Sequence, residues 1–402
     1  MTATPPVPPR RVSYTALARL FLRMSLVAFG GPVAHVAMGE DEIVTRRGWL
    51  SREHYLDLIA AVNLIPGPNS TEVMIHVGYV LRGIPGAILS GFCFIFPAFL
   101  LTLALAVIYV ATGALPAVEA ALWGIKPVIV AIILVAGYRL APTALKTRLH
   151  LLMFAAALIS IVALDIPEVI VMLATGVIYA LIAARLNPNI LALFAIVPVP
   201  LIVQAAAAAG EAVRAGALDL FWYFLKIGSV LFGTGYVLFA YIQGDLVNTF
   251  GWLTSTQLLD AIAIGQFTPG PVSTTAAVVG YLVDGVPGAV AATIGIFLPS
   301  FVLVILTAPL IPRMRRSPFL SAFLSGINVG VIAAILVTVV NLAMEALRPL
   351  GALDGSAAGG TFDLSSGVAV ALAVGSMAAL LRWRVNATLL ILIGAGVGLA
   401  LR

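Results

Sequence analysis

Apolar stretches fill almost the whole chain and are separated by short polar turns. Most of them run for about 17 to 25 residues, the length that an α-helix needs to cross a hydrocarbon core of about 30 Å. Composition points the same way, because 61% of the 402 residues are apolar and only 10% are charged, against roughly 25% in a soluble domain. The pattern predicts an all-α polytopic membrane protein without a sizeable aqueous domain.

The chain repeats itself after a shift of 203 residues. Pro66-Gly67-Pro68 returns as Pro269-Gly270-Pro271, and Gly48-Trp49-Leu50 returns as Gly251-Trp252-Leu253. Further matches, some after a slip of one residue, are Phe29-Gly30 with Phe232-Gly233, Asp57 with Asp260, Ser70-Thr71 with Ser273-Thr274, and Gly124-Ile125 with Gly326-Ile327. Self-similarity at a fixed distance indicates a duplicated structural unit.

The duplication divides the chain into four parts. Residues 1–11 contain four prolines, which oppose helix formation and predict a disordered tail. Residues 12–185 form the first repeat and residues 217–402 the second. Residues 186–216 carry an additional apolar segment, which we expect to cross the membrane and link the repeats.

The short loops carry charges of opposite sign in the two repeats. The basic loop 139–148 corresponds to the acidic segment 345–363, and the acidic turn 165–168 corresponds to the basic turn 382–384. Because short loops rich in Lys and Arg stay in the cytoplasm, equivalent loops face opposite sides. This predicts an inverted-topology tandem repeat, related by a pseudo-two-fold axis in the membrane plane.

Charge pattern and segment length together predict the number of crossings. Residues 52–82 fit the charge bias if they cross once, as two half-helices broken at Pro66-Gly67-Pro68. Each repeat then crosses about six times and the linking segment once, which gives about 13 transmembrane segments. The N-terminus is expected in the cytoplasm and the C-terminus outside.

The two Pro-Gly-Pro breaks are the first candidate site. Proline ends a helix and lacks a backbone donor, so such a break must face protein or a watery cavity. A half-helix starts after each break, and in inverted repeats two positive helix ends converge, which favours an oxyanion site. Its expected members are Pro66, Gly67, Asn69, Ser70, Thr71, Gly270, Ser273 and Thr274. The alternative is that the prolines only kink packed helices, whose ends the hydroxyl groups cap.

A second pair of glycine-rich breaks lies in the first helix of each repeat, at Gly30-Gly31-Pro32 and Gly233-Thr234-Gly235. Glycine allows close backbone approach or an exposed cradle of N–H groups, so Gly30, Gly31, Gly233 and Thr234 are candidate substrate ligands. Close packing between membrane helices explains the same residues equally well.

Ionisable groups inside apolar stretches are costly and are therefore functional candidates. Lys126 is the most isolated cation and is a candidate for binding a divalent anion. Arg23 and Lys226 are matched by the repeat, but both side chains are long enough to reach the membrane interface.

Four further residues are candidates for proton coupling. Glu72 and His76 are four residues apart on one helical face after the first break, a spacing that suits proton relay. Asp57 and Asp260 are matched by the repeat on the half-helices that enter each break. Pairing with a neighbouring helix explains the two aspartates as well as proton carriage does.

The sequence lacks the signals of several other classes of protein. His35, His54 and His150 show no metal-ligand spacing, and the single Cys93 excludes a Cys-based metal cluster, so neither metal nor cofactor is expected. No nucleotide-binding loop of the Gly-x4-Gly-Lys-Ser/Thr type occurs. The net charge of +5 resides in short basic clusters between apolar stretches, which serve as topology signals and make nucleic acid an improbable partner. An intramembrane enzyme would need a clustered nucleophile, base or metal set, which we do not find.

The motifs resemble those of a known family. Phe29-Gly30-Gly31-Pro32, the Gly48-Trp49 turn and 66–71, together with their second-repeat copies, look like the chromate ion transporter (CHR) family, long two-domain type. The resemblance implies a bacterial inner-membrane protein that exports chromate, driven by the proton-motive force, and confers chromate resistance. It also implies that sulfate, a structural analogue, competes with chromate. Membrane lipid and protons are the other expected partners, and the sequence is compatible with a homodimer.

The residues themselves leave the substrate open. Chromate and sulfate are tetrahedral dianions of similar size, so a transporter of sulfate or another oxyanion fits the same pattern. A passive anion channel fits it as well, because only accumulation against a gradient distinguishes a carrier from a channel.

Overall fold

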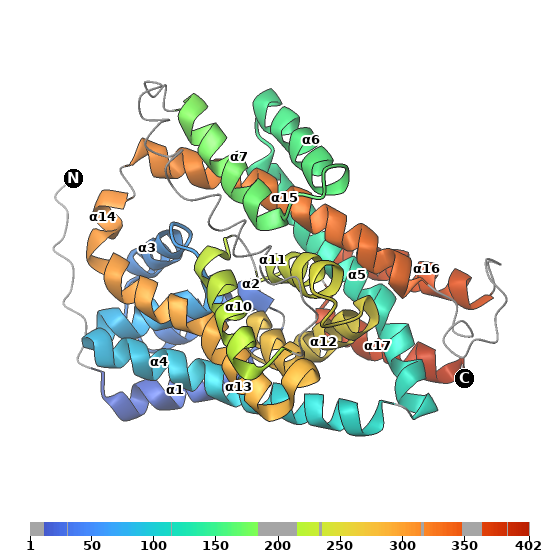
Figure 1. Cartoon of the computed structure of the whole chain (residues 1–402). Coiled ribbons are helices and arrows are strands. Elements are labelled where there is room, and N and C mark those ends of the chain that lie inside the picture. The colour runs from blue at the N-terminus through green and yellow to red at the C-terminus, as the bar shows by residue number, and fades with distance from the viewer. Residues whose placement is uncertain are drawn as a thin grey trace.

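The protein is seen here as a computed structural model (Figure 1). The structure describes residues 12–29, 31–113, 115–183, 215–232, 235–314, 317–347, 364–383 and 385–401. Within these ranges the chain is helical and has no strand, so the prediction of an all-α protein is confirmed. The expected tail 1–11, most of the linking segment 186–216, and Gly30, Gly233 and Thr234 lie outside the described residues.

The first half of the chain forms seven α-helices within the described ranges. They are α1 (Tyr14–Val27), α2 (Gly31–Gly39), α3 (Arg52–Val62), α4 (Asn69–Thr112), α5 (Pro116–Ala144), α6 (Arg148–Val162) and α7 (Glu168–Ala183), with a π-helical segment at Glu40–Arg46. The Ser13 hydroxyl accepts from the Ala16 N–H before α1, and the Ser51 hydroxyl accepts from the His54 N–H before α3. These serines satisfy backbone donors that a helix start leaves free, which explains where both helices begin.

The second half follows the same order of elements. It contains α10 (Ala217–Val230), α11 (Val237–Tyr241), a π-helical segment (Ile242–Thr249), α12 (Ser255–Phe267), a 3-10 turn (Val272–Thr274), α13 (Thr275–Thr307), α14 (Ile311–Met314), α15 (Pro318–Ala346), α16 (Leu364–Ala378) and α17 (Ala387–Ala400). A further 3-10 turn at Ala308–Leu310 precedes α14, and a π-helical segment at Ala379–Trp383 follows α16.

Five helical segments in the described residues are long and apolar enough to cross a membrane. They are Asn69–Thr112, Pro116–Ala144, Val272–Leu310, Pro318–Ala346 and Ser365–Trp383. Three shorter apolar helices, α6, α7 and α17, accompany them. A multi-pass membrane protein is therefore supported, and the count of about 13 crossings stays a prediction.

Helices α4 and α13 each contain a sharp reversal at the same place. The backbone leaves helical geometry at Arg82 and Gly83 in α4, and at Asp284 and Gly285 in α13. Both glycines have positive φ, 65° and 58°, a conformation that a side chain disfavours. A Cβ on Gly78 would lie 2.3 Å from the Gly86 carbonyl oxygen, so the two halves of α4 fold back against each other. Each long helix is thus a tight helical hairpin.

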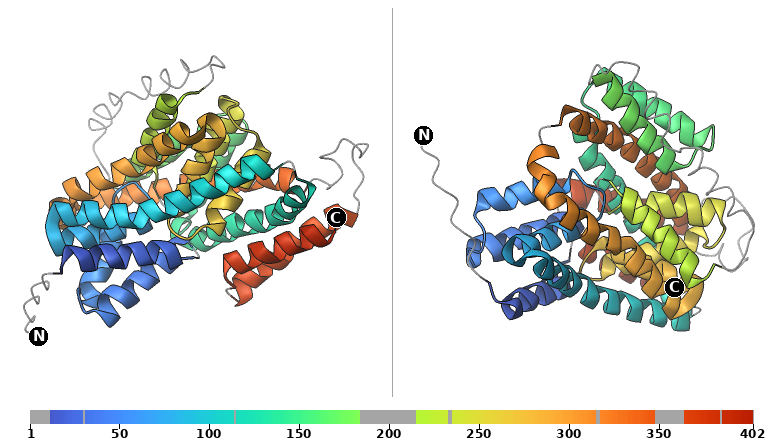
Figure 2. Two further views of the ribbon diagram at one scale, coloured as in Figure 1. Left: turned by 90° about the horizontal axis from the view of Figure 1, so that it is seen from below. Right: turned by 60° about the vertical axis from the view of Figure 1, so that its left-hand side comes forward.

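The two halves of the chain exchange their last helices. Helices α6 and α7 of the first repeat pack against α15 of the second, and Figures 1 and 2 show them side by side. In return, α16 and α17 of the second repeat pack against α5 of the first. Small residues permit the close approach, since a Cβ on Gly124 of α5 would lie 2.1 Å from the Gly394 carbonyl oxygen of α17. Contacts that occur in both directions are those that a two-fold relation produces.

Candidate functional site

The two Pro-Gly-Pro breaks are held by reciprocal hydrogen bonds between the repeats. Helix α3 ends at Val62 and α4 begins at Asn69, while α12 ends at Phe267 and the next turn begins at Val272. In the first break, the Gly67 N–H donates to the Leu231 carbonyl at 2.7 Å. In the second, the Gly270 N–H donates to the Ala28 carbonyl at 3.0 Å. Ala28 and Leu231 are themselves matched by the 203-residue shift.

Each break also packs against the hairpin helix of the other repeat. A Cβ on Gly67 would lie 2.7 Å from Ser300 Oγ of α13, and a Cβ on Gly270 would lie 2.5 Å from Ala98 Cβ of α4. Both glycines have a φ in the left-handed half of backbone space, 143° and 100°. Only glycine combines this φ with such close neighbours. The breaks therefore lie at the contact between the repeats.

The helices that follow the breaks begin with buried hydroxyl side chains. Ser70 and Thr71 are 3% and 0% exposed, and Ser273 and Thr274 are each 1% exposed. The Thr71 and Glu72 N–H groups donate to the Pro68 carbonyl, but the preceding donors of a helix start have no carbonyl within the helix. The Thr102 hydroxyl of α4 contacts the Thr274 hydroxyl at 3.4 Å. The structure thus brings hydroxyl groups from both halves to the breaks.

Several buried polar atoms around the breaks have no hydrogen-bond partner in the described part of the chain. They are Ser25 Oγ, Thr71 Oγ1 and Ser273 Oγ. The Glu72 carboxylate and Ser300 Oγ, which also border the first break, have only each other as partners within the described ranges. A buried polar group without a partner costs about 1 to 3 kcal/mol. A concentration of such groups at one place is what a polar ligand or bound water would satisfy.

His35 connects the first break to α1, a role that the sequence interpretation missed. The side chain is completely buried, with Nε2 3.1 Å from the Ala28 carbonyl and Nδ1 3.2 Å from Ser70 Oγ. A carbonyl only accepts, so Nε2 carries the proton and the Nδ1 of a neutral ring accepts from the Ser70 hydroxyl. From its position in the sequence, His35 was tested only as a metal ligand. The available signal was an ionisable residue in an apolar stretch directly after a glycine-proline break.

Glu72 and His76 are both buried, at 0% and 2% exposed. Glu72 is directed toward the first break, since a Cβ on Gly67 would lie 2.1 Å from its Oε1. The His76 ring packs edge-on against Tyr79, with ring centroids 6.4 Å apart. Proton relay from Glu72 to His76 remains a prediction.

The glycine-rich breaks approach the start of the second half-helix. A Cβ on Gly31 would lie 3.3 Å from the Tyr236 hydroxyl and 3.8 Å from a Val272 methyl group. A Cβ on Gly235 would lie 3.4 Å from Val272 Cβ and 3.8 Å from Ser273 Oγ. Gly31 and Gly235 therefore both border the residues that follow the second Pro-Gly-Pro break.

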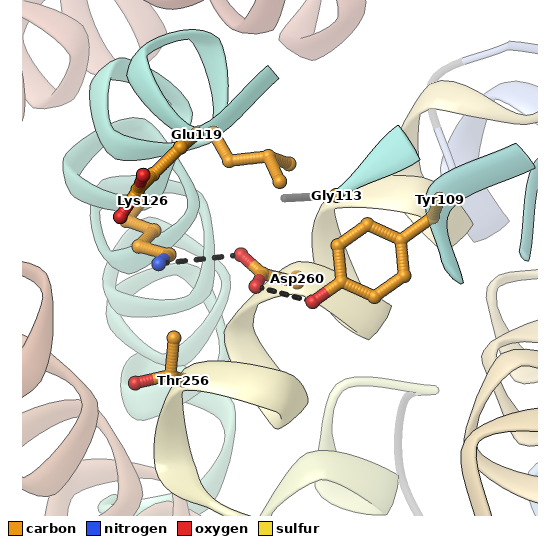
Figure 3. Close-up of a pocket in the computed structure, with 7 residues that line it drawn as sticks. Tyr109, Gly113, Glu119, Lys126, Thr256 and Asp260 are labelled. Atoms are coloured by element: carbon orange, nitrogen blue, oxygen red, sulfur yellow. Dashed lines mark hydrogen bonds and ion pairs between the residues drawn. The ribbon is translucent and has the colours of Figure 1, made fainter. Parts of the chain in front are cut away.

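Lys126 is not isolated, contrary to the expectation from the sequence. Its Nζ lies 3.4 Å from Asp260 Oδ1, and the Tyr109 hydroxyl donates to Asp260 Oδ2 at 2.8 Å (Figure 3). Lys126 and Asp260 are buried, at 7% and 3% exposed. The pair borders a cavity of about 210 Å³, whose lining residues are Tyr109, Gly113, Glu119, Leu122, Lys126, Thr256 and Asp260.

The repeat-matched aspartates differ in their surroundings. Asp57 is exposed, whereas Asp260 is buried in the ion pair with Lys126. The matched cations Arg23 and Lys226, by contrast, share one arrangement. Arg23 lies 3.9 Å from Glu42 and Lys226 lies 3.1 Å from Asp245, at positions related by the same shift.

No group of three or more potential metal-binding side chains occurs among the described residues. The apolar helices, their interruptions at glycine and proline, and the buried polar groups at those interruptions define a multi-pass membrane transport protein. The chain belongs to the chromate transporter family, whose profile matches residues 15–180 and 218–399.

Relatives match over most of their length. A probable chromate transport protein of Synechococcus elongatus is 31% identical, over 84% of this chain and 86% of the relative. The chromate transport protein of Cupriavidus metallidurans is 32% identical over 82% of this chain and 83% of its own length. That of Pseudomonas aeruginosa is 33% identical over 85% of this chain and 84% of its own length. No solved structure matches the chain.

Proposed function

We propose that this protein exports chromate across the bacterial inner membrane, driven by the proton-motive force, and thereby confers chromate resistance. The observation that carries the proposal is the pair of Pro-Gly-Pro breaks, each hydrogen-bonded to the first-helix end of the other repeat and bordered by buried polar atoms without a partner among the described residues. The similarity to chromate transport proteins supports the choice of anion.

In this proposal the dianion binds where the two half-helices begin. The half-helix starts supply backbone N–H groups and the positive ends of two helix dipoles, which stabilise negative charge. Asn69, Ser70, Thr71, Ser273 and Thr274 line these starts, and the unpartnered hydroxyl groups of Thr71 and Ser273 add side-chain donors. The backbone next to the breaks, including Pro66, Gly67 and Gly270, approaches the anion without a side chain in between.

Reciprocal packing supports an inverted repeat as the transport machinery. The exchanged helices and exchanged backbone hydrogen bonds support a two-fold relation between 12–185 and 217–402. Since equivalent loops carry opposite charge, the axis lies in the membrane plane, with the N-terminus cytoplasmic and the C-terminus periplasmic. A site on such an axis becomes accessible from either side as one repeat moves against the other.

Proton coupling is assigned to buried carboxyl groups and their neighbours. Glu72 lies beside the first break, and His76 follows it by one helical turn. Asp260 and its repeat mate Asp57 lie on the half-helices that enter the breaks. Intramembrane carboxyl groups of this kind are the usual carriers of protons in transporters.

Transport of sulfate or another tetrahedral oxyanion is the alternative that the same geometry accommodates. A hydroxyl-lined site at two helix starts recognises charge and shape, which the two anions share. A passive channel for such anions is the second alternative.

The test is uptake of labelled chromate into everted membrane vesicles, which present the cytoplasmic face outward. Accumulation that a protonophore abolishes, and that vesicles without the protein lack, is the expected result. Equilibration without accumulation would indicate a channel. Movement of labelled sulfate without movement of chromate would retain the architecture and refute the chromate assignment.

A further inference from the structure

The ion pair between Lys126 and Asp260 joins the first repeat to the second. Lys126 belongs to α5 and Asp260 to α12. The repeat mates of Lys126 and Asp260 are Asn328 and Asp57, so the other repeat has an asparagine where the first has Lys126. Whatever this pair does occurs once per chain.

The N–O distance between Lys126 and Asp260 is long for two buried charges. The distance of 3.4 Å between Lys126 Nζ and Asp260 Oδ1 exceeds the 2.7 to 2.9 Å of a strong charge-assisted hydrogen bond. Apart from this long contact, Asp260 Oδ1 has no hydrogen bond among the described residues. An ammonium group offers three donors, so Lys126 retains capacity for another acceptor. That capacity borders the cavity of about 210 Å³, which is large enough for bound water or a small anion.

Acidic groups predominate around this cavity. The ionisable groups that line the cavity are Asp260 from α12, Lys126 and Glu119 from α5, and Tyr109 from α4. Glu345 from α15, whose carboxylate accepts from the Thr256 hydroxyl, also acts electrostatically on Asp260. One ammonium group therefore stands against two carboxyl groups that line the cavity and a third, Glu345, nearby. A dianion that entered would be repelled unless the negative charge of the cavity fell.

We propose that an oxyanion takes the place of Asp260 on Lys126, and that Asp260 takes up one proton as it is displaced. The contact between the ammonium group and the carboxylate breaks, a contact between the ammonium group and the anion forms, and a proton from cavity water binds Asp260. The Tyr109 hydroxyl holds Asp260 in place throughout. When the anion leaves, Asp260 returns the proton to water and pairs with Lys126 again. One proton then accompanies each dianion, so one net negative charge is exported, which a membrane potential that is negative inside drives.

The cavity and the proposed anion site are connected by α12. Asp260 precedes Pro269 on the half-helix that enters the second break, which places it roughly 13 Å from that break along the helix axis. The turn at Gly113, which borders the cavity, is periplasmic in the topology that the charge pattern predicts. The inference rests on the proposed function for the identity of the anion and for the direction of transport. It makes this cavity the last contact of an exported anion before release.

Proton uptake on binding can be measured directly. Purified protein is titrated calorimetrically with chromate at mildly alkaline pH, where chromate is a dianion, in buffers of different ionisation enthalpy. The expected uptake is about one proton per anion bound. Chromate affinity should therefore fall by up to about tenfold for each unit that the pH is raised. Asp260→Asn should abolish both the uptake and the pH dependence. Lys126→Met should weaken binding at least about tenfold.

Two further variants control the measurement. Asp245→Asn breaks another Lys–Asp pair, between Lys226 and Asp245, which does not line the cavity, and it should leave proton uptake unchanged. The double variant Lys126→Met with Asp260→Asn leaves no unpaired buried charge, so it should fold even if a single variant does not. Weak binding without pH dependence is expected of it.

The outcomes separate this inference from the proposed function. Chromate binding without proton uptake by the wild type, or undiminished uptake by Asp260→Asn or by the double variant, overturns the inference. If Ser70→Ala with Ser273→Ala binds chromate normally while Asp260→Asn loses the uptake, the inference stands and the breaks are not the anion site. If the serine variant binds poorly and the wild type takes up no proton, only the inference fails.

Discussion

The backbone N–H of Gly67 donates to the carbonyl of Leu231, and so ties the first Pro-Gly-Pro break to the end of α10 in the second repeat. The matched bond from Gly270 to Ala28 ties the second break to the end of α1. A buried N–H that finds its partner in the other repeat makes the two breaks depend on each other. Movement of one repeat therefore changes the surroundings of both breaks.

Gly67→Ala should destabilise the protein and abolish transport. The new Cβ would meet Glu72 and Ser300 at distances shorter than van der Waals contact, in a backbone conformation that disfavours a side chain. We expect a loss of about 2 to 4 kcal/mol of stability, combining strain and overpacking, measured by thermal unfolding in detergent.

Gly48→Ala is the matched control for this substitution. Gly48 also has a positive φ, 58°, but nothing lies within 4 Å of its would-be Cβ. It should cost only about 1 to 2 kcal/mol and retain transport. Equal effects of the two substitutions would contradict the close packing of the first break.

Ser70→Ala with Ser273→Ala should weaken chromate affinity while leaving membrane insertion intact. Each hydroxyl contributes about 0.5 to 1.5 kcal/mol in a typical hydrogen bond, and up to about 3 kcal/mol to a charged group. We therefore expect a loss of roughly tenfold or more, measured as the half-saturation concentration for uptake into everted vesicles. Unchanged uptake would move the anion site away from the breaks.

Glu72→Gln should separate proton coupling from anion movement. The amide keeps the size of the carboxyl group beside Gly67 but cannot carry a proton. Downhill exchange of labelled chromate should persist, whereas accumulation sensitive to a protonophore should disappear. Normal accumulation in this variant would exclude Glu72 as the proton carrier.

His35→Leu should change chromate affinity through Ser70 without contacting the anion itself, because the Ser70 proton that points to Nδ1 in the wild type becomes available to the anion. Its loss frees the Ser70 hydroxyl from Nδ1 and leaves only the Gly270 N–H on the Ala28 carbonyl. We expect about 1 to 3 kcal/mol of destabilisation from the broken buried hydrogen bonds, measured by thermal unfolding.

The effect of His35→Leu on transport should vanish in a protein that already carries Ser70→Ala, because the two side chains act as one unit. Additive changes in affinity in the double variant would show that His35 acts independently of Ser70.

Composition, helix-length apolar stretches and internal repetition established the class of protein from sequence alone. These signals are local or periodic, so they need no knowledge of which helices touch. The positions of the Pro-Gly-Pro breaks were equally visible, because proline and glycine act on their own backbone. Family membership followed from the same motifs and is confirmed by the profile match over both repeats.

Only the tertiary structure decided which residues meet. Lys126 and Asp260 are far apart in the chain, as are Gly67 and Leu231, and their contacts depend on how the repeats cross. His35 was dismissed because its partners, Ser70 and the Ala28 carbonyl, depend on the fold of the chain after α1. A sequence shows the cost of burying a charge or a hydroxyl group, but the group that offsets that cost is selected by packing.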